Sequence, residues 1–159
     1  MRTPARLTTL LLIGAVDVLE PLYSRVIVPA AVLAELKDAA APAPVIWWIS
    51  QPPAWLEVRP DPPLDATLDF LDPGERAALT LAQLLNADEL LIDEQAGRDE
   101  ARRRHLRVTG TLGVLADAHL AGLFNFDRAL TLLRSTNFRL SADVERLVRR
   151  RVAAERREP

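Results

Sequence analysis

The sequence predicts an α/β fold in which a small parallel sheet lies between layers of helices. Short apolar runs that suit strands alternate along the chain with longer segments whose apolar residues recur at helical spacing. One of these runs, Leu90-Leu91-Ile92, has no polar residue between its apolar ones, which is typical of a strand covered by helices on both faces. Short strands that alternate with helices favour a parallel sheet between helical layers.

The first half of the chain supplies two predicted strands among its helices. Residues 6–23 carry leucines, valine and alanine at helical spacing, and the β-branched run 26–28 follows as a strand. Pro29 suits the first turn of the next helix. Residues 43–51 read as another helical piece and residues 55–60 as the second strand, which leads into a proline-rich connection.

The second half opens with the clearest local signal, a helix start. Asp72 is placed to act as the N-cap, Pro73 as the first helical residue and Glu75 as the partner that completes a capping box. We expect further strands over residues 89–93 and 106–109, and further helices over residues 95–104 and 112–121 and in a last stretch capped by Ser141. No internal repeat is visible.

Length and composition narrow the classes of function. A chain of 159 residues is long enough to bury a real core, and we expect one domain over residues 1–159, with residues from about 153 to 159 disordered. The net charge of −2 gives no general attraction to nucleic acid, so such binding must come from local patches. The chain has no cysteine and two histidines, so a bound ion would have oxygen ligands, which favours Mg²⁺ or Mn²⁺ over Zn²⁺.

The same features indicate where the protein works. A chain without cysteine fits a reducing cytoplasm, which is the expected location. The first residues loosely resemble a signal peptide, but Asp17 and Glu20 come early and no small-residue cleavage site precedes them. No apolar run approaches the roughly 20 residues of a membrane span, so we expect no membrane partner.

Three acidic residues are candidates for one shared site. Asp93 ends a predicted strand, Glu35 lies on the helix after another strand, and Glu75 lies at the start of a helix. Ligands of open α/β sheets bind beyond the carboxyl ends of the strands, so all three can face one crevice. Clustered carboxylates repel each other unless a cation or protons balance them, and a divalent metal also activates water and shields a phosphate. Arginines that follow the strand could hold phosphates nearby: Arg98, Arg102, Arg103, Arg104 and Arg107.

Each of these residues also has a simpler interpretation. Glu75 can serve only the capping box, and Glu35 can lie on the solvated side of its helix. Asp93 can cap the helix that follows it, and the arginines can form an ordinary solvated helix face. The sequence alone leaves both interpretations open.

Four segments, taken in order, resemble the PIN-domain family, specifically the branch of PIN-like proteins related to VapC-type toxins. They are "LLIGAVDVLEPLYSRVIVPAAVLAEL", "LDPGERAALTLA", "LLIDEQAGRDEARRRHLRVTGTLGVL" and "AGL…LLRSTNFRLS". They look like the family's first helix with the helix of its second acid, its Gly-Glu helix start, its acid-bearing strand with a Thr-Gly loop, and its tail. The resemblance covers about residues 7–147. No single segment is specific to the family, but the four segments in this order are.

The resemblance implies a three-layer α/β/α fold and a metal-dependent ribonuclease that hydrolyses RNA phosphodiester bonds. It places the catalytic and metal-binding acids at Glu35, Glu75 and Asp93, with Mg²⁺ or Mn²⁺ as the cofactor. Arg98 and Arg102 would meet the phosphate of the RNA substrate. Thr109 and Thr111 match polar positions of the loop near the site and would also bind the RNA or its phosphate. By the same resemblance the protein would be the toxin of a VapBC-type toxin–antitoxin pair, forming a homodimer and binding a small antitoxin. The apolar stripe of the last helix and the Trp47-Trp48 pair are candidate contact surfaces, unless both belong to the core.

The beginning of the chain departs from the family pattern. The family's first strand ends in an Asp that should fall at Thr3, and "MRTPARL" reads as neither that strand nor that acid. Either translation starts further upstream, where an apolar stretch ending in Asp would restore both, or this copy has lost a ligand. The second possibility favours a different class of function, a degenerate PIN fold that binds an antitoxin or another protein without catalysis. A small phosphatase or nucleotide-binding domain is a weaker third interpretation, because the chain lacks a glycine-rich phosphate loop and a convincing nucleophile.

Overall fold

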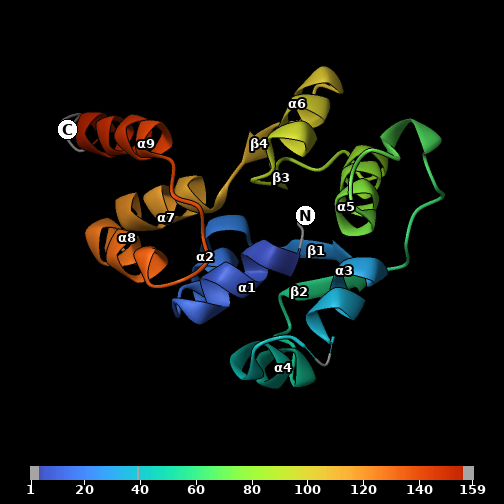
Figure 1. Cartoon of the computed structure of the whole chain (residues 1–159), viewed down its shortest axis with the longest axis horizontal. Helices are drawn as coiled ribbons and strands as arrows, with labels where there is room; N and C mark the ends of the chain where they lie inside the picture. The colour runs from blue at the N-terminus through green and yellow to red at the C-terminus, as the bar shows by residue number, and fades with distance from the viewer. Residues whose placement is uncertain (1–3, 39, 156–159) are drawn as a thin grey trace.

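The structure is a computed structural model that describes residues 4–38 and 40–155. Short parallel strands lie among helices (Figure 1), as the sequence predicts. In chain order the elements are α1 (Pro4–Leu12), η1 (Val16–Val18), α2 (Leu19–Tyr23), β1 (Val26–Pro29), α3 (Ala30–Leu36), α4 (Ala43–Ser50), β2 (Leu56–Arg59), η2 (Ala66–Leu68), α5 (Pro73–Leu84), β3 (Leu90–Leu91), α6 (Gln95–Arg103), β4 (Val108–Thr109), α7 (Thr111–Leu120), α8 (Phe126–Arg134) and α9 (Ala142–Glu155).

The strands form two separate parallel pairs. β1 pairs with β2, with Val28 opposite Val58, and β3 pairs with β4, with Leu91 opposite Thr109. Within the described part of the chain no strand joins β1 to β3, so the sheet is interrupted between the two pairs (Figure 1). The parallel direction of the strands is confirmed, whereas the single predicted sheet is instead divided into two pairs.

The two pairs nevertheless belong to one layer, because their side chains divide between the same two hydrophobic cores. Val28 and Leu91 pack into a large core with α1, α2, α7 and α8. Leu90 and Ile92 pack on the opposite face, in a second core with η2, α5 and α6, and Ile27 contacts this second core. Each fully buried leucine stabilises its core by roughly 1.5–3 kcal/mol. Helices therefore cover both faces of the strands, and the three-layer α/β/α architecture is confirmed.

Local chemistry explains where the helices begin. The side chain of Asp72 accepts a hydrogen bond from the Glu75 amide at 2.7 Å, so the predicted N-cap of α5 is confirmed. The predicted helix over residues 6–23 is instead broken after α1, where Gly14 has a φ of 67°. Glycine takes this left-handed conformation without steric cost, which allows the chain to turn into η1 and α2.

The structure adds one helix and locates the candidate contact surfaces. No helix was expected over residues 126–134, but α8 lies there, and Asn125 caps it by accepting a hydrogen bond from the Arg128 amide.

Trp48 contacts the large core and its ring centroid lies 5.9 Å from that of Trp55, whereas Trp47 is 70% exposed. α9 ends at Glu155, and its stripe is partly exposed, with Leu147 at 68%.

The beginning of the described chain is helical, since α1 starts at Pro4. Thr3, to which the resemblance assigned the first acid, lies outside the described residues. Among the residues that are described, none of the helices is long and apolar enough to cross a membrane.

Candidate active site

The three candidate acids lie on different elements at the same end of the strand layer. Glu35 is on α3, which begins directly after β1. Asp93 lies two residues after the end of β3, and Glu75 is on the first turn of α5. Glu75 is buried at 3% exposure, and Glu35 and Asp93 are half-buried.

Each of these carboxylates lies close to a glycine, and at Gly74 and Gly110 an added side chain would clash with the carboxylate. A methyl group on Gly74 would meet the two Glu35 carboxylate oxygens at 2.9 and 3.0 Å, so Glu35 reaches the first turn of α5 beside Glu75. A methyl group on Gly97 would lie 3.6 Å from Glu75 Oε1, which places the Glu75 side chain against α6. Glu35 therefore contacts α5, Glu75 contacts α6, and Asp93 lies near Arg98 of α6.

Asp93 is held by the start of α7. Its Oδ1 accepts a hydrogen bond from the Thr111 amide at 2.7 Å, and its Oδ2 accepts one from the Thr111 hydroxyl at 2.8 Å. Asp93 therefore caps α7, and not the helix that follows it in sequence. Thr111 is completely buried, so its hydroxyl acts on the site by orienting Asp93. The predicted direct contact of Thr111 with phosphate does not fit this burial.

Arg98 lies beside Asp93. Its Nη1 donates to the Ile92 carbonyl at 2.8 Å, and a methyl group on Gly110 would lie 2.4 Å from Asp93 Oδ1 and 3.0 Å from Arg98 Nη1. The guanidinium has five N–H donors, and the Ile92 bond uses one. Burial and the neighbouring charge of Arg102 lower the pKa of Arg98. Arg102 is exposed on the same helix and donates to Asp99 at 3.2 Å.

The electrostatics around Glu35 favour a balancing positive charge. Burial raises the pKa of the Glu35 carboxyl, and the negative charge of Asp72 raises it further. A neighbouring cation would reverse this effect by stabilising the ionised form. Asp72 thus belongs to the acidic surroundings of the site as well as to the α5 cap. The sequence identified it only as a cap.

The carboxylate oxygens of the three acids are the type of ligand that Mg²⁺ and Mn²⁺ prefer. Their arrangement is less favourable. Over residues 4–38 and 40–155, no three acidic or histidine side chains come close enough together to hold a metal ion. The described residues therefore include the right kind of ligand, but no three of them are grouped closely enough to hold an ion.

Thr109 has a different environment from the one expected of a phosphate contact. It is 9% exposed, and a methyl group on Gly113 would lie 2.3 Å from its hydroxyl oxygen. The Thr109 side chain therefore packs against α7. Like Thr111, Thr109 is buried where the strands end, and its side chain helps to fix the position of α7.

Comparison with known protein families supports the architecture described above. Residues 5–154 match the family DUF3368, which is described as a PIN domain. The chain belongs to the PIN-domain family. No match is found among curated proteins or among solved structures. PIN domains are a nuclease-type fold and are generally metal-dependent hydrolases, so this coarse functional class applies here.

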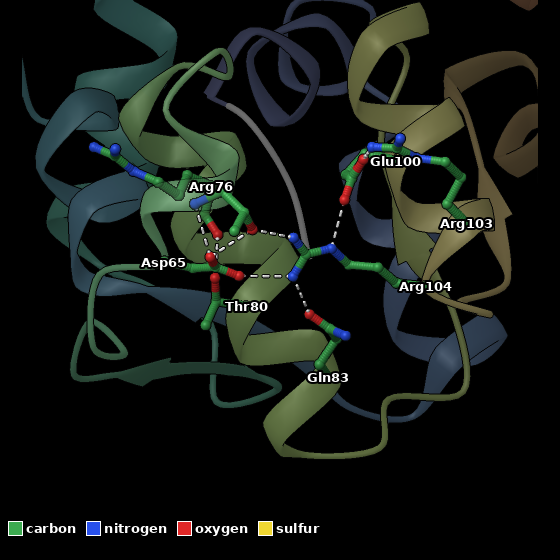
Figure 2. A network of polar contacts seen from close by, with 8 residues as sticks. Asp65, Arg76, Thr80, Gln83, Glu100, Arg103 and Arg104 are labelled. Carbon is green, nitrogen blue, oxygen red and sulfur yellow. Dashed lines mark hydrogen bonds and ion pairs between the residues drawn. The ribbon is translucent and has the colours of Figure 1, made fainter.

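In this PIN domain a polar network fixes α6 against α5 (Figure 2). Arg104, which follows α6, donates to Glu100 at 2.6 Å, to Asp65 at 2.7 Å and to Gln83 at 3.0 Å. Hydrogen bonds from Thr67 and the Arg104 guanidinium hold the pKa of Asp65 at about 2. Because α5 carries Glu75 and α6 carries Arg98, the network sets how these side chains lie relative to each other. Sequence patterns missed it, since its members are up to 39 residues apart.

Replacing Gly110 by alanine is expected to destabilise this PIN domain by about 3 kcal/mol, because the new methyl group displaces Asp93 from two charge-assisted hydrogen bonds. Thr111→Val removes only the hydroxyl bond and should cost about 1 kcal/mol. Urea unfolding of both variants measures the two values. Equal stability of Gly110→Ala and the parent chain would show that Asp93 is not held as described.

Proposed function

We propose that this protein is a metal-dependent endoribonuclease in which Glu35, Glu75 and Asp93 are the catalytic carboxylates. The observation that carries the proposal is the position of these three acids. Each lies against a glycine next to a helix start, around the ends of the two strand pairs. Membership of the PIN family supports the nuclease class. At Gly74 and Gly110 the carboxylate occupies the place that a side chain on the glycine would take.

The side chains have distinct roles in this proposal. Glu35, Glu75 and Asp93 would hold Mg²⁺ or Mn²⁺, which when bound would activate a water molecule and neutralise phosphate charge. Thr111 fixes the orientation of the Asp93 carboxylate through its amide and hydroxyl. Arg98, anchored on the Ile92 carbonyl, and the exposed Arg102 would bind the phosphates of the RNA strand.

The finer biological role is part of the same proposal. We infer a cytoplasmic toxin of a VapBC-type pair, which forms a homodimer and is bound by a small antitoxin. The exposed apolar side chains offer contact surfaces for these partners: Trp47 on α4, and Val144 and Leu147 on α9. Exposed apolar residues near one another commonly mark protein contacts.

The test is cleavage of a mixed RNA pool in the presence of Mn²⁺. The parent chain is expected to produce fragments, and Asp93→Asn is expected to lower the rate by about a hundredfold or more, because it removes a charge that would hold the ion. Asparagine keeps the shape of the side chain and can still accept from the Thr111 amide, so the fold should persist. Asp17→Asn, at an exposed acid on η1 away from the three carboxylates, is the matched control and should cleave at the parent rate.

Equal product from the parent chain and Asp93→Asn would mean that the activity is a contaminant. The second candidate function is a PIN-fold binding module without catalysis. It is favoured by the absence, among the described residues, of three acids that converge on one ion. Calorimetric titration with Mn²⁺ separates the two candidates. No heat from a protein with a folded circular dichroism spectrum would favour the binding module.

A further inference from the structure

One aromatic ring is exposed on the connection that leads into α5. Phe70 lies between η2 and α5 and is 58% exposed. Its neighbours Leu68 and Leu71 are both buried, and they pack into the second hydrophobic core with α5 and α6. The chain is therefore anchored on either side of Phe70, while the Phe70 side chain extends into solvent.

Polar bonds hold the same turn in place. Asp69, which directly precedes Phe70, forms an ion pair with Arg76 of α5. The Leu71 amide donates a hydrogen bond to the Leu68 carbonyl at 2.9 Å. A backbone that is already ordered loses little conformational freedom when it binds a ligand. The aromatic ring is thus presented on a fixed turn and not on a loose loop.

The turn lies at the end of α5 that carries the candidate acids. Phe70 precedes the N-cap residue Asp72 by two positions, so their Cα atoms are at most about 7 Å apart. Burial, and then the negative charge of Asp72, raise the pKa of the Glu35 carboxyl. Glu35 also reaches Gly74, in the first turn of α5. Phe70 therefore borders the candidate active site on the side of Glu35.

The other side of the site is positively charged. Arg98 lies beside Asp93, and Arg102 follows one turn later on α6. Glu75 lies between the two sides, because it is on α5 and its side chain faces Gly97 of α6. Arginines bind phosphate groups, whereas an exposed aromatic ring binds the flat face of a base. The three acids thus lie between a side that suits phosphate and a side that suits a base.

We propose that Phe70 is a stacking site for a base of single-stranded RNA, close to the phosphate that is cleaved; this inference rests on the proposed ribonuclease function. A base fits Phe70 better than a protein partner does, because the flanking Asp69 and Asp72 are exposed and charged, and protein contacts need a contiguous apolar patch. The same carboxylates repel phosphate, so the base and not the RNA backbone would face this turn. Bases in a duplex are already stacked, so the site favours unpaired RNA.

Phe70→Ala is expected to lower the rate of Mn²⁺-dependent cleavage of a single-stranded RNA pool about tenfold or more, because the stacking contact is lost. Phe70→Tyr keeps the ring and should cleave at the parent rate. Phe70→Leu keeps only the apolar character and should behave like the alanine variant. Leu64→Ala, at a more exposed apolar residue of the same connection, is the matched control and should leave the rate unchanged. Cleavage by Phe70→Ala at the parent rate would overturn the stacking site and leave the ribonuclease proposal intact.

Photocrosslinking tests the same contact without catalysis. The full chain is mixed, with Mn²⁺ omitted, with a single-stranded oligouridine that carries one iodouridine, a base that crosslinks to aromatic side chains on which it stacks. Mass spectrometry should locate the crosslink at Phe70, and the crosslink should disappear in Phe70→Ala and persist in Phe70→Tyr. A crosslink only at other residues, or none, would overturn the proposal. If Phe70 is crosslinked but the parent chain cleaves no RNA with Mn²⁺, the base-binding site stands and the ribonuclease proposal fails.

Discussion

Glu75→Gln is expected to lower Mn²⁺-dependent RNA cleavage by about a hundredfold or more, with little loss of stability. Glu75 is buried at 3% exposure on the first turn of α5, and its Oε1 faces Gly97 of α6. Glutamine has nearly the same size, so the packing against α6 should persist. What is lost is the negative charge on which the affinity for a divalent ion depends. Initial cleavage rates and thermal unfolding of the same preparations measure both effects.

Glu100→Gln is the matched control, because Glu100 is also a buried glutamate, at 6% exposure. Its carboxylate is bonded to Arg103 and Arg104, so neutralising it leaves buried positive charge uncompensated. We expect this variant to unfold more easily and, under conditions where it is folded, to lose far less RNA cleavage than Glu75→Gln. If both variants lose activity in proportion to stability, Glu75 has a structural role only and the assignment of the site is wrong.

Arg104→Met is expected to lower the free energy of unfolding by about 3 kcal/mol, because removing one partner leaves the buried Glu100 carboxylate poorly compensated. For a chain of this length the midpoint of thermal unfolding should fall by about 6 to 12 °C. Methionine keeps much of the volume of the arginine stem, so the change tests the polar bonds more than the packing. Thermal and urea unfolding measure the effect.

Arg103 provides the comparison, because it bonds the same Glu100 carboxylate from a position that is 73% exposed. Solvent weakens such an exposed pair, so Arg103→Met should cost at most about 1 kcal/mol. The double variant Arg103→Met with Arg104→Met shows whether the two contributions add. Similar losses from the two single variants would contradict a network that depends on the buried position of Arg104.

The sequence predicted those parts of the fold that depend on local patterns. Asp72, Pro73 and Glu75 specify the start of α5 within four residues, and the cap is present as predicted. The apolar run before Asp93 correctly indicated a strand covered on both faces. α8 was missed although the sequence carries a signal for it, because Phe126, Ala129, Leu130 and Leu133 recur at helical spacing. The break at Gly14 was missed because glycine is also tolerated within helices.

The candidate site was predictable in its residue types and less so in its geometry. The positions of Glu35, Glu75 and Asp93 at one end of the strand layer follow from the order of strands and helices. The contact between Asp93 and Thr111 joins residues 18 apart and depends on how α7 packs, so no local pattern reveals it. The burial of Thr109 and Thr111 likewise depends on α7, so no local pattern reveals it, and their contact with phosphate stays a prediction.

The interruption between β1 and β3 has a consequence for how the protein unfolds. The strand pairs come from separate stretches of the chain, and no backbone ladder in the described residues connects them. Cooperativity between the halves must then rest on side-chain packing through the two cores. The β3–β4 half, with two residues in each strand, is the natural candidate to open first while the β1–β2 half stays closed. Any molecule that bridges the two edges would make these openings a single concerted event.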